Sequence, residues 1–234
     1  MSARVSQRLA EGSAPVFYPA AEIVAALNEA QRFFVLLTLG LEKTAAWTVP
    51  AFGANGGAPF FHMLQFFTDW IVPLRIATAS GAKVRPASLG DLDSLDAQWW
   101  NSPGSPLRYA ALGADFLAIY PQPAAGATTL QVTYARAPAP LAAAGDVPEI
   151  PAPYHPRLVD YGVYRCRQVE GGQEFAKSLP YLDDFFEGAI VYAKYIRARS
   201  VGARYDKLPF ELEKFDRRKL LKLVTTRQSQ PAGE

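Results

Sequence analysis

Three closely spaced aspartates are the first residues whose types and spacing could do chemistry. Asp91, Asp93 and Asp96 could begin a calcium-binding loop, in which carboxylate oxygens coordinate the ion. An EF-hand loop, however, requires a glycine where Asp96 stands and a bidentate glutamate where Ser102 stands. The sequence therefore predicts no metal site at these carboxylates.

The chain has few histidine and cysteine residues that could bind a metal or act in catalysis. His62 and His155 are the only histidines, they lie far apart, and no cysteine accompanies either at zinc spacing. The sequence contains no Gly-x-Ser-x-Gly, Walker or dinucleotide-binding motif, and the glycines at 53, 56 and 57 lack the strand and helix that would make them phosphate ligands. We therefore expect no catalytic site, no cofactor and no metal, and hence a protein that is not an enzyme.

Composition indicates the cellular compartment in which the protein resides. The single cysteine, Cys166, excludes a disulfide within the chain and is typical of a reducing environment. No apolar run reaches the roughly 20 residues of a membrane span, and the first residues lack a signal-peptide pattern. We expect a protein of the cytoplasm without a membrane partner.

Two adjacent tryptophans suggest an interface. Trp99 and Trp100 precede a short polar loop with Pro103 and Gly104. Neighbouring side chains point to opposite faces of a strand, so one ring can pack inward while the other meets a neighbouring molecule. The alternative is that both rings are buried under the loop at 101–106.

A basic segment near the C-terminus is the second candidate interface. From Lys194 to Arg227 there are 11 Lys/Arg and 4 Asp/Glu, a local balance of +7 in a chain of net charge +2. A predicted helix over 209–224 combines these cations with an imperfect apolar stripe, whose exposure would forfeit about 1.5–3 kcal/mol per large side chain. The helix should therefore dock on its own bundle, an adjacent subunit, another protein or, through its cations, a phosphate backbone.

Two long helical patterns must position these segments. Apolar residues recur at helical spacing over 23–41 and again over 175–196, so two amphipathic helices from opposite ends of the chain can bury each other. We expect the first helix over 19–39, ended by Gly40, and later helices over 155–169 and from about 173. Pro180 predicts either a kink or a helix start capped by Ser178.

The residues between these helices are patterned as strands and turns. Turn signals recur every eight to twelve residues, which predicts an antiparallel sandwich or barrel, and Ser88 with Asp91 predicts a capped short helix through Leu95. The fold class is therefore α+β: a discontinuous helical bundle domain (1–40 and 154–225), an inserted β-rich domain with a Pro-rich return (41–153), and a flexible tail (226–234).

The chain resembles the head-to-tail adaptor, or tail-tubular, proteins of tailed bacteriophages over about residues 15–165. The resemblance rests on an ordered series of segments: AAEIVAALNEAQR (20–32), DWIVPLR (69–75), RPASL (85–89), LAIYPQP (117–123) and PEIPAPYHPRLVDY (148–161). Between the third and fourth segments, the match also includes Leu92, Leu95, Trp99 and Tyr109-Ala110. The C-terminal basic segment, the Gly-rich stretch 53–57 and the aromatic run 60–67 match no part of the pattern.

This resemblance implies a structural virion protein at the head-tail junction, present in the host cytoplasm during assembly. It implies a homo-oligomeric ring, commonly a dodecamer, that binds the portal protein above and a tail or nozzle protein below, with genomic DNA passing through the lumen during genome ejection. Trp99 and Trp100 are then candidates for a subunit or tail interface. The candidate portal-docking residues, placed by position alone, are Leu208, Leu212, Phe215, Arg217, Arg218, Lys219 and Lys222. The alternative function is a nucleic-acid-binding module that uses the basic C-terminal helix.

Overall fold

The computed structural model describes residues 1–9, 17–53, 59–124, 128–143 and 145–199. The chain divides into two compact units. The helical unit is built from Met1–Gly40 and the chain from Pro138 onward, and the β unit is Leu41–Ala137.

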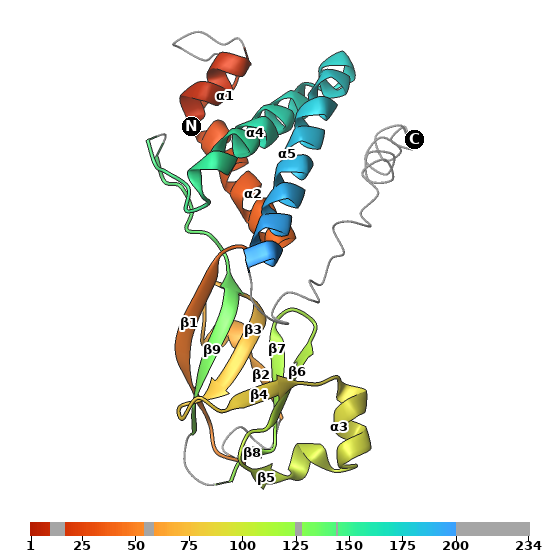
Figure 1. Cartoon of the computed structure of the whole chain (residues 1–234). Coiled ribbons are helices and arrows are strands. Elements are labelled where there is room, and N and C mark those ends of the chain that lie inside the picture. The colour runs from red at the N-terminus through yellow and green to blue at the C-terminus, as the bar shows by residue number, and fades with distance from the viewer. Residues whose placement is uncertain (10–16, 54–58, 125–127, 144, 200–234) are drawn as a thin grey trace, which may run out of the picture. The chain divides into compact units, whose positions relative to one another are not determined.

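Helices that are distant in sequence pack together in the helical unit (Figure 1). Its elements are α1 (Ser2–Arg8), α2 (Ala20–Thr38), the 3-10 turn η3 (Ala152–Tyr154), α4 (His155–Glu170) and α5 (Gly172–Arg199). The apolar stripe predicted for α2 is buried at Ile23, Leu27 and Phe34, and α2 packs on both α4 and α5.

Aromatic rings fill the space where α2 meets α5. The Phe185 ring lies with its centroid 5.8 Å from that of Phe33 and 5.9 Å from that of Phe34. The Tyr192 ring of α5 stacks on Phe34 with centroids 5.6 Å apart and lies tilted against Tyr154 with centroids 4.5 Å apart. These contacts join α2, α5 and the start of α4 into one core.

The end of α2 shows why glycine stands at position 40. The helix ends at Thr38, and the residue with left-handed backbone is Leu39 (φ 52°), one position before the predicted glycine. The buried Leu39 side chain anchors that conformation. Gly40 is needed for a different reason, since a Cβ there would lie 2.3 Å from a ring carbon of Tyr192.

Gly40→Ala should therefore lower the free energy of unfolding of the protein by about 1–3 kcal/mol, the usual cost of overpacking a tight contact. Gly90→Ala in α3 is the matched control, because the added Cβ meets nothing closer than 3.9 Å. Alanine favours a helix by up to about 1 kcal/mol over glycine, so the control should be neutral or stabilised. Urea titrations of both variants test this, and equal midpoints would contradict it.

The boundary between α4 and α5 lies where the sequence predicts it. Gly171 and Gly172 both have positive φ values, so glycine allows the chain to leave α4 and begin α5. Pro180 lies inside α5, and the predicted helix start at Ser178 is wrong. The Ser178 hydroxyl instead donates to the Phe175 carbonyl oxygen at 2.6 Å within a continuous helix.

The β unit contains one curled, half-barrel sheet of seven strands in the order β1-β9-β3-β4-β6-β7-β2 (Figure 1). Its strands are β1 (Glu42–Val49), β2 (Phe60–His62), β3 (Trp70–Thr78), β4 (Lys83–Pro86), β6 (Arg108–Leu112), β7 (Phe116–Tyr120) and β9 (Thr128–Arg136), with a separate pair formed by β5 (Pro103–Gly104) and β8 (Gln122–Pro123). The 3-10 turn η1 (Met63–Gln65) follows β2.

The predicted α+β class is confirmed. The β-rich part was expected to be an antiparallel sandwich or barrel, and it is instead a curled half-barrel whose sheet is mixed. Strand β4 pairs in parallel with β6, with Arg85 opposite Arg108. A parallel pair needs a long crossover, and the chain between these strands supplies one that holds α3 (Leu89–Leu95) and the 3-10 turn η2 (Trp99–Asn101). The regular spacing of turn signals does not distinguish this crossover from hairpins.

Candidate functional site

The crossover helix α3 and turn η2 carry the two tryptophans singled out from the sequence. Trp99 is buried, whereas Trp100 exposes 47% of its surface and Leu95 exposes 52%. The two tryptophans lie in a 3-10 turn, and their rings meet edge to face with centroids 6.2 Å apart, one buried and the other exposed. We call the exposed pair Leu95 and Trp100 the Trp100 patch.

Hydrogen bonds fix the backbone beneath this patch. Ser88 and Asp91 form the predicted capping box, since each side chain accepts a hydrogen bond from the other residue's backbone N–H. The buried Trp99 ring packs edge-on against Phe60, with centroids 5.9 Å apart. Trp100 is therefore presented by a structured turn, which reduces the entropy that binding would cost.

Two carboxylates beside the patch are held by neutral donors. Asp93 accepts a hydrogen bond from the Trp99 indole nitrogen at 2.8 Å, and Asp96 accepts one from the Ser102 hydroxyl at 2.5 Å and one from the Gln98 N–H at 2.8 Å. The hydrogen bond from Ser102, followed by that from Gln98, lowers the pKa of Asp96 below its usual value. Among the described residues, no Lys or Arg pairs with Asp93 or Asp96, so the patch is flanked by uncompensated negative charge.

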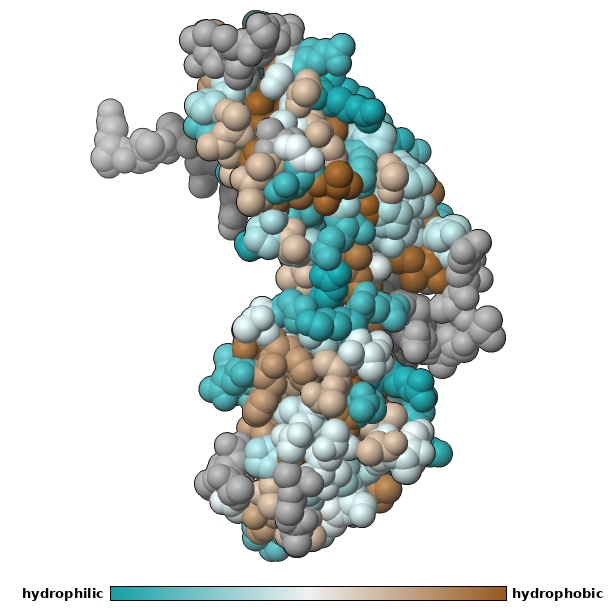
Figure 2. Space-filling view, turned by 90° about the vertical axis from the view of Figure 1, so that its left-hand side faces the viewer, coloured by the Kyte–Doolittle hydropathy of each residue, from teal (hydrophilic) through white to brown (hydrophobic). Residues whose placement is uncertain are grey.

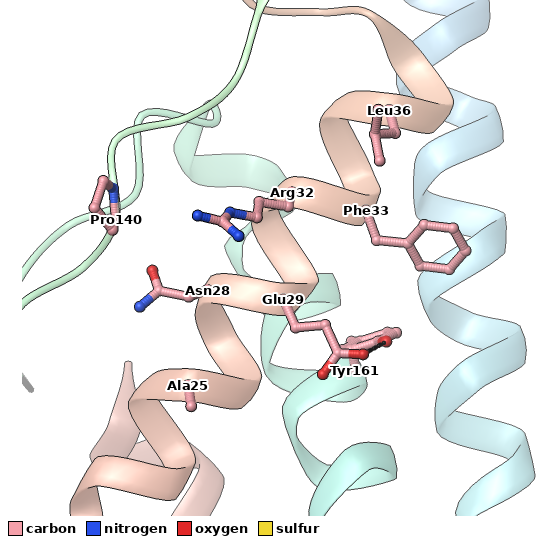
Figure 3. Close-up of a pocket in the computed structure, with 8 residues that line it drawn as sticks. All are labelled: Ala25, Asn28, Glu29, Arg32, Phe33, Leu36, Pro140 and Tyr161. Carbon is pink, nitrogen blue, oxygen red and sulfur yellow. Dashed lines mark hydrogen bonds between the residues drawn. The ribbon is translucent and has the colours of Figure 1, made fainter. Parts of the chain in front are cut away.

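The helical unit has an open groove of about 600 Å³ along α2 (Figure 3). Residues from α2, α4 and the Pro-rich segment line this α2 groove: Ala25, Asn28, Glu29, Arg32, Phe33, Leu36, Pro140 and Tyr161. Leu36 exposes 46% of its surface, and Figure 3 shows Phe33 pointing from α2 toward α5. The groove therefore offers apolar surface that the fold does not cover.

One cation of the α2 groove, Arg32, has no partner in the part of the chain that the structure describes. Glu29 is satisfied, because it accepts hydrogen bonds from the Tyr161 hydroxyl at 2.8 Å and from Arg165 Nε at 3.0 Å. Burial, together with the hydrogen bond to Glu29, raises the pKa of the Tyr161 hydroxyl, which stays a donor. The exposed Arg32 makes no ion pair or hydrogen bond with any residue that the structure describes.

Polar side chains of α2 hold the Pro-rich segment as a wall of this groove. Asn28 binds Leu141 twice, donating to its carbonyl oxygen at 2.9 Å and accepting from its N–H at 2.7 Å. Gln31 donates to the Ala139 carbonyl oxygen at 2.8 Å. These side-chain hydrogen bonds replace the strand pairing that a Pro-rich segment cannot make.

A buried carboxylate ties α1 to α4. Asp160 accepts a hydrogen bond from Arg8 of α1 and lies 3.5 Å from an Arg157 nitrogen. Burial raises the pKa of Asp160, although both arginines oppose that shift. The Arg157 side chain also lies directly over Gly188 of α5, because a Cβ at that glycine would be 2.3 Å from Arg157 Cγ. This cluster is fully used in packing three helices, so it does not form an open site.

The remaining candidate residues from the sequence have separate positions. His155 begins α4, and its ring Nε2 hydrogen-bonds with the Ile150 carbonyl oxygen at 2.7 Å. Cys166 is buried in α4. The predicted helix over 209–224 and all seven candidate portal-docking residues lie outside the described residues.

The described ranges hold neither a cluster of metal ligands nor a membrane-spanning helix. Within residues 1–9, 17–53, 59–124, 128–143 and 145–199, no three His, Cys, Asp or Glu side chains cluster in a way that could hold a metal ion. In the same part of the chain, no helix has the length and apolar character needed to cross a membrane.

Sequence reasoning missed the α2 groove. It considered only the buried stripe of α2, whereas the groove uses the opposite side, where Ala25, Arg32 and Leu36 recur at helical spacing. On the face of the molecule shown in Figure 2, apolar surface interrupts polar surface in several places. A second apolar stripe that contains one arginine is the signal that could have revealed the groove.

Comparison with known proteins identifies the class. The family model described as SU10 adaptor protein matches residues 1–205. Since this match covers most of the chain, the protein belongs to the SU10 adaptor protein family. The family is one of phage head-to-tail adaptors, so the chain is a bacteriophage structural protein and a virion component. No curated protein matches the chain.

Proposed function

We propose that this protein is the head-to-tail connector of a tailed-phage virion and acts without catalysis. It forms a ring under the portal, links the capsid to the tail and lets genomic DNA pass through its lumen. In this proposal a helical bundle carries the inserted β-rich domain. The family match over residues 1–205 is the observation that carries the proposal.

Surface chemistry supports a role in assembly. The Trp100 patch and the α2 groove both expose apolar side chains, and exposed aromatic residues on structured turns are typical of binding hot spots. We propose that Trp100, braced by Trp99, lies in a contact with a neighbouring subunit or the tail. We propose that the basic C-terminal segment binds the portal protein. Its docking residues are Leu208, Leu212, Phe215, Arg217, Arg218, Lys219 and Lys222.

Native mass measurement with and without the portal protein tests the connector. We expect a ring, commonly of twelve copies of the 25.6 kDa chain, on the portal. A chain that ends before Leu208 should lose portal binding, because it lacks the proposed docking residues, whereas a control that ends before Gln228 should keep it. Protein that stays monomeric with its portal, without rings in electron micrographs, would contradict the proposal.

The charge of the C-terminal segment favours nucleic-acid binding as a second candidate function. The balance of +7 between Lys194 and Arg227 predicts duplex binding that weakens with salt, with a slope near −0.9 per phosphate contacted. Replacing Lys214, Arg217, Arg218, Lys219 and Lys222 by glutamine separates the two functions. Loss of DNA binding with intact portal assembly favours nucleic-acid binding, and loss of portal assembly favours the connector.

A further inference from the structure

The Trp100 patch combines an aromatic anchor with negative charge. Trp100 and Leu95 expose about half of their surfaces, and the carboxylates of Asp93 and Asp96 are bound only by neutral donors among the described residues. Such a surface needs a partner that offers an apolar recess and a cation. An arginine suits both needs, because its guanidinium stacks on indole rings and pairs with carboxylates.

The α2 groove offers these two properties. Leu36 and Ala25 supply open apolar surface, and Glu29 is already neutralised by Arg165 at 3.0 Å. The charge left in the groove is that of Arg32, whose guanidinium extends from α2 on the side of Asn28 and Pro140 (Figure 3). The groove therefore complements the patch in both hydrophobicity and charge.

We propose that the Trp100 patch of one copy of this chain docks in the α2 groove of the next copy, with Arg32 facing the Trp100 ring and the carboxylates of Asp93 and Asp96. This inference rests on the proposed connector function and names the subunit contact within it. The two surfaces belong to different units of the chain, so one copy can offer its patch to one neighbour and its groove to another. In that arrangement the contacts are heterologous, and heterologous contacts generate closed rings when their rotation closes.

A second copy is favoured over a tail protein because both halves of the contact are present in one sequence. A single aromatic side chain buries roughly 150–250 Å², less than the roughly 800 Å² per partner of a stable interface. The patch is therefore an anchor at the centre of a wider interface, where hot-spot residues concentrate. Weak association of the free protein, strengthened on the portal, is the expected behaviour.

Substitutions at the two surfaces test the contact by sedimentation of the full-length chain with and without its portal. Trp100→Ala should weaken self-association at least about 30-fold, the effect of losing a hot spot. Arg32→Glu should weaken it about tenfold or more, because it places like charges opposite each other. The matched controls are Phe116→Ala, another exposed aromatic residue of the β unit, and Arg4→Glu, another exposed arginine of the helical unit. Both controls should associate as the natural protein does.

Cross-linking tests the same contact by proximity. One sample of protein carries Leu36→Cys, a second carries Ala97→Cys, and the mixture is treated with a bifunctional maleimide. Cys166 is buried, so only the introduced thiols should react readily. We expect covalent dimers in the mixture but not when the second sample carries Ala114→Cys in the β6–β7 turn.

The outcomes distinguish this contact from the connector function. Rings in electron micrographs without cross-linked dimers, or rings unaffected by Trp100→Ala, would overturn the contact and leave the connector intact. Cross-linked dimers without rings would support the contact and overturn the ring. Loss of tail attachment in Trp100→Ala with normal subunit association would also overturn the contact, because it assigns the patch to a tail protein.

Discussion

Phe185→Ala should lower the free energy of unfolding of the helical unit by about 3–5 kcal/mol, the usual cost of truncating a buried phenylalanine. Phe185 is fully buried, and its ring contacts Phe33, Phe34, Tyr161 and Phe186 from three helices. These rings come from distant segments, so neighbouring side chains cannot refill the space without moving whole helices. The loss should therefore lie at the upper end of that range.

The positions of the tryptophans allow this loss to be assigned to one unit. All four tryptophans, at positions 47, 70, 99 and 100, lie in the β unit, whereas helix content measured by circular dichroism comes mainly from the helical unit. Phe185→Ala should shift the urea midpoint of the dichroism signal. Val191→Ala is the control, since Val191 lies on the same helix and is half exposed, and it should change stability by less than about 0.5 kcal/mol. A fluorescence midpoint that moves while the dichroism midpoint stays would refute the assignment.

Asp69→Ala should destabilise the β unit by about 1–3 kcal/mol. Asp69 accepts a hydrogen bond from the Tyr134 hydroxyl at 2.7 Å and pairs with Lys43 at 3.0 Å. Tyr134 is fully buried, so its hydroxyl would lose its acceptor away from water. Lys43→Ala should cost less than about 1 kcal/mol, because that pair is exposed to solvent. Tryptophan fluorescence in urea measures both variants.

The same carboxylate predicts a pH dependence. Burial raises the pKa of Asp69, but the hydrogen bonds from Tyr134 and Lys43 outweigh it and hold the pKa below its usual value. Asp69 therefore contributes stability above the unfolded-state pKa, near 3.9, and that stability is lost as the pH falls through the folded-state pKa. Asp69→Asn keeps an acceptor for the Tyr134 hydroxyl but cannot titrate, so the part of the pH dependence of the free energy of unfolding that comes from Asp69 should disappear. Unchanged acid sensitivity in Asp69→Asn would show that other carboxylates are responsible.

The elements with strong local signals could be predicted from the sequence. The helical spacing of Ile23, Leu27 and Phe34 predicted α2, and the pair of glycines at 171 and 172 predicted the boundary between α4 and α5. The capping box of α3 was also readable, because Ser88 and Asp91 stand three positions apart before a short apolar pattern. In each case a few neighbouring residues determine the backbone conformation.

Features that depend on distant residues could not be predicted. The parallel pairing of β4 with β6 is decided by how the crossover packs. The need for glycine at position 40 comes from the ring of Tyr192, which lies 152 positions away in the sequence. The different burial of Trp99 and Trp100 arises in a 3-10 turn that the sequence did not reveal. The α2 groove was missed because its wall comes from the Pro-rich segment held by Asn28.

The way the chain enters and leaves the β unit has a mechanical consequence. It enters at Leu41 and leaves at Ala137, and β1 and β9 run side by side from that end, with the Arg136 N–H donating to the Leu41 carbonyl oxygen at 2.9 Å. A pull on both connections from that end draws the two strands in the same direction. The tension is then shared by two covalent paths, and the ladder between the strands is not peeled open.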